Sequence, residues 1–278
     1  MALANLSRLL KDAMVHGYAI GSYNMVDINS LEAIINGAVR LNSPIIVSVS
    51  ENHFPYVDIE KMSSVIGYLA NNASIPVGLH LDNGQSIAAI MKAIRRGFTS
   101  VMFDGSRLPL AENMARTAEI VRFAHAAGVA VEGHIGKISE VGNENLEQTD
   151  PSKAAMFVQA TGIDALALDF QASGSVIFPK ININLELIKE IYDSTGIPLV
   201  LTEGSGLGDN DIKAAIRHGV RKINIYTDLS RQANKAIRQE LAEDPELPYV
   251  EIKTVARMGM EKVVMDKIKV FGSCRVLN

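Results

Sequence analysis

Apolar and polar positions follow a repeating order along the chain. A short run of apolar residues ends in polar turn residues, and a longer segment with apolar residues at helical spacing comes next. The short runs are typical of strands covered on both faces, as in a parallel sheet, and the longer segments of amphipathic helices. The pattern predicts eight strands, each followed by a helix, at residues 18–24, 45–50, 77–81, 100–103, 130–134, 165–169, 199–202 and 222–225. Further helices are predicted at residues 7–15 and 250–270.

Eight strand–helix units of similar length fit best in a closed ring. The sequence therefore predicts an α/β fold, a (β/α)8 TIM barrel with additional N- and C-terminal helices. No linker rich in Pro, Gly or Ser interrupts the pattern, so we expect a single domain over residues 1–278. A doubly wound sheet is the alternative. It is less favoured because Gly17 and Gly21, beside the first strand, lack the spacing of a phosphate-binding glycine motif.

The predicted strand at residues 77–81 ends directly on Asp82, Asn83 and Gly84. In barrels of this class, ligands bind and chemistry takes place at the carboxyl ends of the strands. Asp82 is therefore our first candidate for a catalytic acid or base. The structural alternative is an Asx turn that leads into the following helix.

The residues that end the other predicted strands should converge on the same mouth, because all strands of the barrel run in one direction. They form a polar set that is rich in acids: Asn24, Ser50, Asp104, Glu132, His134, Asp169, Thr202, Glu203, Asn224 and Thr227. The loop Gly204-Ser205-Gly206 lies where such barrels commonly bind phosphate through backbone N–H groups. A plain turn is the alternative for this loop.

Glu132 and His134 are two residues apart on one predicted strand, so their side chains share a face. Together with Asp82 and Glu203 they would hold a divalent metal or form a proton-transfer pair. The structural alternative is that His134 only hydrogen-bonds to a carboxylate. We expect His80, on the strand before Asp82, to be a satisfied core residue that faces the barrel interior.

The composition of the chain limits the classes of binding partner and the cellular location that we expect. The net charge of -4 provides no excess of Lys and Arg for a nucleic-acid backbone, so we expect no nucleic-acid partner. No apolar run approaches the roughly 18 residues that span a membrane, and the N-terminus lacks the features of a signal peptide. The single cysteine, Cys274, fits a reducing environment, so we expect a cytoplasmic protein.

Several of these segments match one family in order along residues 9–273. The matches include Gly-Tyr-Ala-Ile-Gly-Ser-Tyr-Asn at 17–24, Leu-His-Leu-Asp at 79–82, the segment 97–106, Gly-Ser-Gly at 204–206 and Lys-Ile-Asn-Ile at 222–225. The chain thus resembles the class II fructose-bisphosphate and tagatose-bisphosphate aldolases. The resemblance implies reversible aldol cleavage of a phosphorylated ketose, with a zinc ion that polarises the ketone. Such enzymes form oligomers through their C-terminal segments, so we expect a homodimer or homotetramer.

The resemblance also implies roles for individual residues. Asp82 falls on the acid/base position, and Glu132 is the second catalytic candidate. Residues that would handle the substrate or its phosphate are Asn24, Ser50, Gly174, Gly204, Ser205, Asn224 and Thr227.

The zinc ligands of the family do not carry over to this chain. The four ligand positions hold Asn83, His134, Ser173 and Thr202. Amides and hydroxyls do not replace imidazoles on zinc with comparable affinity. A rebuilt site from His134, Glu203 and Asp169 would suit Mg²⁺ or Mn²⁺ better, and a site without metal is the remaining alternative. Glu203 also stands where a glycine amide of the family faces a phosphate.

Three hypotheses follow from the sequence. The first is a lyase that acts on a phosphorylated ketose or a related sugar with an altered metal site. The second is a catalytically inactive aldolase homologue that serves as a binding or regulatory subunit. The third is an aldolase that forms a Schiff base through lysine, which we favour least because only Lys137 lies near the carboxyl end of a predicted strand.

Overall fold

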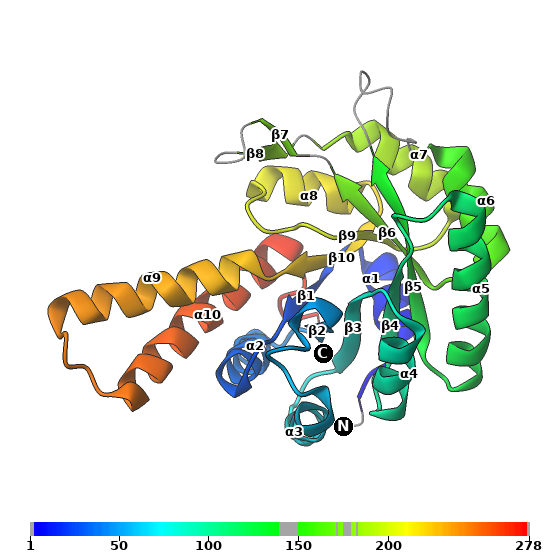
Figure 1. Ribbon diagram of the computed structural model, residues 1–278. Coiled ribbons are helices and arrows are strands. Elements are labelled where there is room, and N and C mark those ends of the chain that lie inside the picture. Colours follow the sequence, from blue (N-terminus) through cyan, green and yellow to red (C-terminus); the bar gives the residue numbers. More distant parts are fainter. Residues whose placement is uncertain (1–2, 139–149, 171, 175–178, 182, 277–278) are drawn as a thin grey trace.

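The strands form a closed parallel barrel in the order β1-β10-β9-β6-β5-β4-β3-β2. The computed structural model describes residues 3–138, 150–170, 172–174, 179–181 and 183–276, and Figure 1 shows their arrangement. The prediction of a (β/α)8 barrel is confirmed, and the doubly wound alternative is wrong. The barrel strands are β1 Ile20–Asn24, β2 Ile45–Ser50, β3 Val77–Gly84, β4 Ser100–Asp104, β5 Ala130–Ile138, β6 Ala165–Phe170, β9 Leu199–Leu201 and β10 Val220–Ile225.

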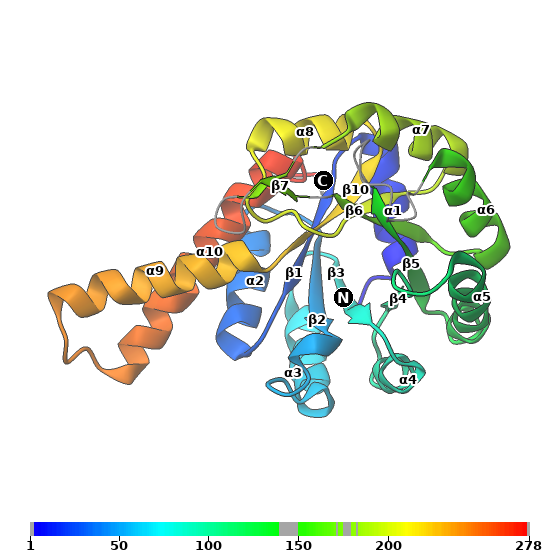
Figure 2. The ribbon, with the colours of Figure 1, turned by 45° about the horizontal axis from the view of Figure 1, so that its top comes forward.

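Helices follow the strands and surround the barrel (Figure 2). Their bounds are α2 Ile28–Arg40, α3 Ile59–Asn72, α4 Ile87–Arg95, α5 Leu110–Ala126, α6 Pro151–Thr161, α7 Leu185–Thr195, α8 Asp209–Arg217 and α9 Thr227–Glu243. Two small elements were not predicted. A 3₁₀ turn, η1 Glu51–His53, follows β2, and an antiparallel hairpin of β7 Ala172–Gly174 and β8 Pro179–Ile181 lies between β6 and α7.

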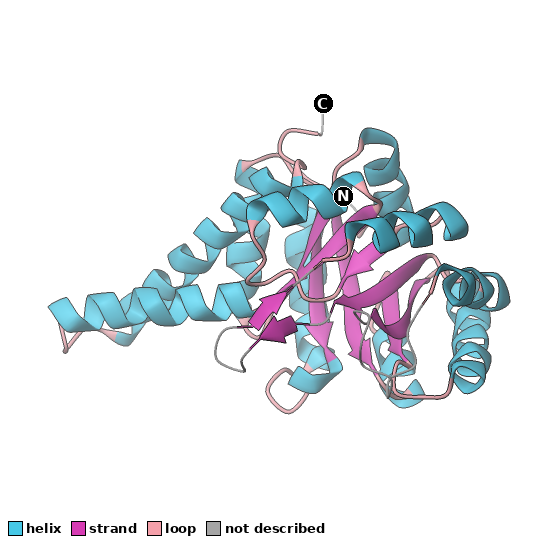
Figure 3. Ribbon diagram, turned by 90° about the horizontal axis from the view of Figure 1, so that it is seen from above, coloured by secondary structure: helices cyan, strands magenta, loops and turns pink. Residues whose placement is uncertain are grey.

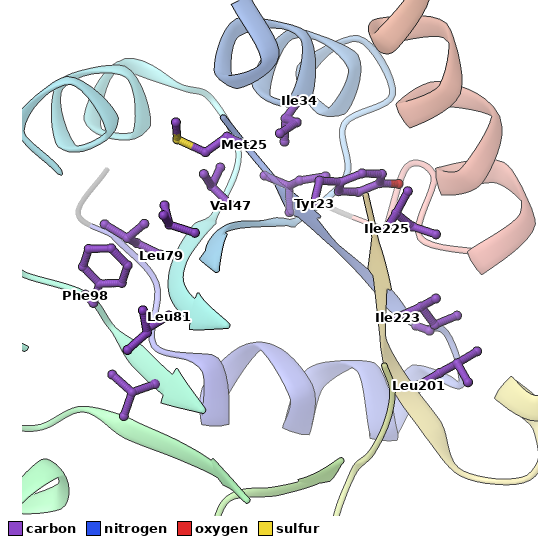
Figure 4. Close-up of a cluster of buried hydrophobic side chains, with 14 of the residues drawn as sticks. Tyr23, Met25, Ile34, Val47, Leu79, Leu81, Phe98, Leu201, Ile223 and Ile225 are labelled. Atoms are coloured by element: carbon purple, nitrogen blue, oxygen red, sulfur yellow. The ribbon is translucent and has the colours of Figure 1, made fainter. Parts of the chain in front are cut away.

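The outward faces of the strands build the main apolar core. Figure 4 shows part of it, where Tyr23 and Val47 lie with Ile34 of α2. Leu79 and Leu81 alternate with inward-facing residues on β3 and belong to the same core. This alternation fixes which side chains of each strand face the barrel interior.

The barrel interior is apolar at its amino end and polar above. The first helix, α1 Leu6–His16, closes the amino end, where its apolar face packs with Ile20, Ile46 and Val200. The next inward positions are polar and almost fully buried: Ser22, Ser48, His80, Ser100, Glu132 and Lys222. The residues that end the strands lie one further layer toward the mouth. The side chains at the strand ends therefore lie directly above a layer of buried polar side chains.

The last two helices form an arm that projects away from the barrel (Figures 1 and 3). Helix α10, Tyr249–Phe271, runs back along α9 and also packs against α2. This confirms the predicted C-terminal helix. Val264, Ile268 and Phe271 are buried near the barrel, whereas the outer part of the arm exposes apolar side chains. Among the described helices, none is both long and apolar enough to cross a membrane.

Candidate active site

Asp82 lies at the centre of the mouth and is held by three amides. Asn24 and Asn83 donate to Oδ2 over 2.8 and 3.1 Å, and Asn224 donates to Oδ1 over 3.1 Å. The carboxylate is 2% exposed. Because Asn24 and Asn224 turn their N–H groups toward Asp82, their carbonyl oxygens face elsewhere. Both oxygens are buried and have no hydrogen-bond partner among the described residues.

Glu51 holds the turn after β2 against the loop after β3. Its Oε2 accepts from the backbone N–H groups of Gln85, at 2.6 Å, and Ser86, at 3.2 Å, while its Oε1 accepts from Ser86 Oγ at 2.8 Å. Ser50, one of the predicted substrate-binding residues, receives a weaker contact from Asn83 Nδ2 at 3.4 Å. Glu51 is therefore a structural anchor, and the two loops around Asp82 are fixed relative to one another.

His134 pairs with Asp104 at the ends of the neighbouring strands β5 and β4. Nδ1 of His134 lies 2.9 Å from Asp104 Oδ1, which also accepts from Ser106 Oγ at 2.6 Å. Burial opposes ionisation of Asp104, but the hydrogen bond and charge of His134 outweigh it and hold the pKa of Asp104 below its usual range. This bond to a carboxylate is the structural alternative that we considered for His134.

A buried charged cluster lies one layer below Asp82. Lys222 Nζ is 2.8 Å from Glu132 Oε2 and 3.4 Å from His80 Nε2, and His80 Nδ1 is 2.8 Å from Ser100 Oγ. The side chains of Glu132, His80 and Lys222 are fully buried. His80 is thus the core residue that we expected. Glu132 shares the inward face with His134 but lies deeper, whereas Lys222 was not identified from the sequence.

The pKa values of two members of this cluster shift for the same physical reason. Burial raises the pKa of Glu132, with Lys222 acting in the opposite direction and the charge of Asp82 adding to the rise. Burial also lowers the pKa of His80 well below its ordinary value, and the charge of Lys222 lowers it further. The influence of Asp82 on Glu132 shows that the cluster and the mouth are electrostatically connected.

The loop after β9 meets the start of α9 at the mouth. Gly204 N–H donates to Asn224 O over 3.0 Å, and a Cβ atom on Gly204 would overlap the side chain of Ile223. Ser205 Oγ accepts from the backbone N–H of Asp228 at 3.3 Å. Helix α9 begins at Thr227, and its N-cap residue, Tyr226, makes no capping hydrogen bond through its side chain. Gly204, Ser205 and the first turn of α9 therefore lie together, as the sequence predicted.

Two residues near Asp82 were missed by the sequence reasoning. His53 ends the turn η1 after β2, and Tyr226 follows β10 directly. Their ring centroids are 4.6 Å apart, with an angle of 50° between the planes. Glu51, in the same turn as His53, is bound to the loop after β3, the strand that carries Asp82. The sequence could have indicated both residues only through their positions, because each closely follows a predicted strand. Neither residue belongs to a recognisable motif.

Comparison with known proteins agrees with this geometry. The family model for fructose-bisphosphate aldolase class-II matches residues 4–275. The chain belongs to the class II fructose-bisphosphate aldolase family. This confirms the resemblance that was read from the sequence motifs.

Relatives within the family align over nearly their whole length. A fructose-bisphosphate aldolase of Staphylococcus aureus (strain Mu50) is 38% identical over 287 residues, covering 98% of this chain and 98% of the relative. A probable fructose-bisphosphate aldolase of Bacillus subtilis is 36% identical over 285 residues, covering 98% and 99%. Among solved structures, the YdjI aldolase of Escherichia coli K12 is 33% identical and superimposes with a TM-score of 0.88 over 98% of both chains.

The residues at the family's zinc positions do not fit a zinc ion. Thr202 Oγ1 donates to the backbone carbonyl of Leu168 over 3.2 Å, and the Asn83 amide donates to Asp82. His134 uses Nδ1 for Asp104, and the side chain of Ser173 lies outside the described residues. Within the described ranges, no group of three or more His, Cys, Asp or Glu side chains is arranged to hold a metal. The donor set therefore lacks the imidazoles that zinc requires.

The predicted rebuilt metal site is only partly described. Glu203 is exposed, and its partner in the proposed set, His134, is turned to Asp104. The side chain of Asp169 lies outside the described residues, as does that of Lys137, while Gly174 is placed only by the backbone of β7. Lys222 is fully buried against Glu132, so its amine is not presented at the mouth for a Schiff base.

Proposed function

We propose that the protein is a lyase that catalyses reversible aldol cleavage of a phosphorylated ketose or a related sugar. The observation that carries the proposal is the fixed carboxylate of Asp82 at the mouth of the barrel, at the position to which the family resemblance assigns the acid/base. The two relatives described above are both named as fructose-bisphosphate aldolases. No comparison favours the alternative of an inactive binding or regulatory subunit.

Asp82 would move the proton of the substrate hydroxyl at which the chain is cleaved. As the carboxylate accepts this proton, the O–H electron pair forms the carbonyl of the departing aldehyde. The electrons of the breaking C–C bond then pass to the ketone-derived fragment and produce an enediolate. Uptake of one proton at the enediolate carbon gives dihydroxyacetone phosphate and balances the proton that Asp82 removed and later releases. Condensation runs through the same steps in reverse. The three amides hold the carboxylate in one orientation, which is the arrangement that efficient proton transfer needs.

The phosphate would bind on the side of β9 and β10. Tyr226, the N-cap residue of α9, provides no side-chain cap, and Ser205 Oγ accepts from the first-turn N–H group of Asp228. A helix N-terminus favours an anion through its N–H groups and its dipole. Gly204, Ser205 and Thr227 surround this end of α9.

The remaining candidates would bind the sugar hydroxyls. The buried carbonyl oxygens of Asn24 and Asn224 are free to accept from hydroxyl groups, because their N–H groups point to Asp82. Ser50 would add a hydroxyl contact beside them, and Gly174 would contribute backbone groups. Glu132, buried one layer below Asp82, would influence the protonation of Asp82 through its charge.

Zinc at the family's position is not part of this proposal, because the donors present do not fit it. The set of His134, Glu203 and Asp169 is the alternative place for a divalent metal such as Mg²⁺. The negative charge of the enediolate must be compensated with or without a metal. The following experiment distinguishes a site without metal from one that holds a divalent metal.

An aldol-cleavage assay on the purified protein tests the proposed activity and its metal dependence together. We expect dihydroxyacetone phosphate to be released from at least one member of a panel of ketose phosphates, measured by enzymatic coupling. We also expect elemental analysis to find substoichiometric zinc, and added zinc to leave the rate unchanged, since only one imidazole is present at the four positions. Addition of Mg²⁺ or Mn²⁺ after chelation tests the alternative site.

The matched control is a family member that retains the zinc ligands, treated with the same chelator, which should lose its activity. Absence of turnover across the whole panel would contradict the lyase assignment. Stoichiometric zinc that survives dialysis would contradict the loss of the family's metal site.

We further propose that the protein is a homodimer or homotetramer that associates through the α9–α10 arm. The arm projects from the barrel and exposes Tyr249, Val250 and Met258, which are 74%, 68% and 63% exposed. Light scattering should give the mass of a dimer or tetramer, and Met258→Glu should shift it toward the monomer. Val15→Glu, at an equally exposed site on α1, is the control and should leave the mass unchanged. A monomeric wild-type protein would contradict this proposal.

We place the protein in the cytoplasm. Cys274 is its single cysteine and is free, so a disulfide within one chain is excluded.

A further inference from the structure

His53 and Tyr226 come from elements on either side of β1. In the barrel, β1 lies between β10 and β2, and each ring follows one of these two neighbours. The rings meet at 4.6 Å between centroids, so together they bridge the end of β1, the strand that carries Asn24. The pair therefore forms a wall of the mouth beside the bond between Asn24 and Asp82.

The position of His53 is fixed by its own turn. Its backbone carbonyl accepts from the N–H groups of Tyr56 and Val57, both at 2.8 Å. At the start of the same turn, Glu51 is bound to the backbone after β3, the strand that carries Asp82. The turn that carries the imidazole is consequently fixed against the loop after β3, and Tyr226 packs against the ring.

One ring nitrogen of His53 is left for a ligand. The Nδ1 atom is buried and has no hydrogen-bond partner among the described residues, although the ring as a whole is partly exposed. Burial lowers the pKa of His53, and the negative charge of Asp82 only partly opposes this shift. A neutral imidazole can accept or donate a hydrogen bond at this atom. A buried polar atom without a partner is unfavourable unless a ligand supplies one.

We propose that His53 contacts the substrate and helps to determine specificity, its Nδ1 atom hydrogen-bonding a hydroxyl group of the sugar beside Asp82. Tyr226 acts as a positioning residue that holds the imidazole. This inference rests on the proposed function, because it takes the ligand to be a polyhydroxylated ketose phosphate. It adds a recognition element on the β2 side of the mouth, next to the proposed phosphate site, because Tyr226 directly precedes α9.

Steady-state kinetics on the wild type and two His53 variants test this contact. His53→Phe keeps a ring against Tyr226 but removes the nitrogen, and His53→Asn keeps a polar group near the position of Nδ1. We expect His53→Phe to lower kcat/KM about tenfold, the loss of one hydrogen bond, and His53→Asn to recover part of it. Tyr226→Phe should behave as wild type and Tyr226→Leu should not. His16→Phe, on exposed α1, is the control.

Substrates that lack single hydroxyl groups make the assignment specific. The deoxy analogue that lacks the hydroxyl bound by His53 should be cleaved equally well by the wild type and His53→Phe, while the other analogues keep the tenfold difference. Equal kcat/KM of His53→Phe and wild type on the parent sugar would overturn the proposal. So would an equal loss for every analogue, which indicates a purely structural role.

A binding experiment separates this inference from the proposed lyase activity. If the wild type cleaves no ketose phosphate, the lyase assignment fails, and nitrogen NMR of the His53 ring during titration with dihydroxyacetone phosphate and fructose bisphosphate decides the contact. A ligand-dependent shift of Nδ1 in the wild type, absent in a titration with inorganic phosphate, supports it. No shift with either sugar phosphate overturns it.

Discussion

Replacing Asp82 with asparagine should lower kcat for aldol cleavage by about a thousandfold, within the range expected when a general base is removed. The change keeps the shape of the side chain but removes the oxygen that accepts the substrate proton. Three neighbours currently donate to this carboxylate: Asn24, Asn83 and Asn224. Their amides can rotate to present carbonyl oxygens to the new N–H groups, so we expect the fold to be retained. Coupled assays of dihydroxyacetone phosphate release measure the effect.

The control for this variant is Asp27→Asn. Asp27 caps α2 after β1 and accepts from Ser30 N at 2.7 Å, a role that asparagine also fills. We expect its kcat to stay close to that of the wild type. Retention of a tenth or more of the wild-type kcat by Asp82→Asn would remove Asp82 from the proposed mechanism.

Replacing Lys222 with methionine should cost about 3–5 kcal/mol of unfolding free energy at neutral pH, the usual cost of breaking a buried ion pair. Without the ammonium group, the fully buried carboxyl of Glu132 loses its ion-pair partner. Its pKa is already raised by burial and would rise further, so folding would be linked to proton uptake. The deficit should therefore be small below the unfolded-state pKa of about 4.3 and grow as the pH rises above it. Urea unfolding at several pH values measures this.

The double variant Lys222→Met, Glu132→Leu is the matched control. Both charges are gone in this protein, so it should be more stable at neutral pH than the single variant, and its stability should depend less on pH. A single variant as stable as the wild type, or a deficit that is the same at every pH, would contradict the buried ion pair.

The barrel could be predicted because each strand and helix carries its own local pattern. The strand predicted at residues 77–81 appears as Val77–Gly84, and the one at 222–225 as Val220–Ile225. The differences lie at the ends, where Asp82, Asn83 and Gly84 extend β3 and Val220 and Arg221 extend β10 beyond the apolar run. The hairpin of β7 and β8 was missed because its three-residue strands carry no periodicity.

The sequence predicts those site residues whose place at the mouth depends only on their position along a strand. Asp82, Asn24 and Asn224 follow or end their strands, and the parallel barrel brings them together. Lys222 and Glu132 are ninety residues apart, and only the strand order and register of the closed ring bring them into contact. His53 and Tyr226 meet across β1 for the same reason. Pairings of this kind depend on the three-dimensional arrangement and have no local signature.

Helix α9 connects two distant parts of the molecule as one stiff rod. Its first turn, at Thr227 and Asp228, is bound to Ser205 and to Lys267 of α10, whose Nζ lies 3.0 Å from Asp228 Oδ2. Its last turn lies near the tip of the projecting arm. A helix of 17 residues is about 25 Å long, so a small tilt imposed at the tip displaces the opposite end as well. Docking of a second subunit at the tip would thus shift the other end of the helix, where we propose that the phosphate binds.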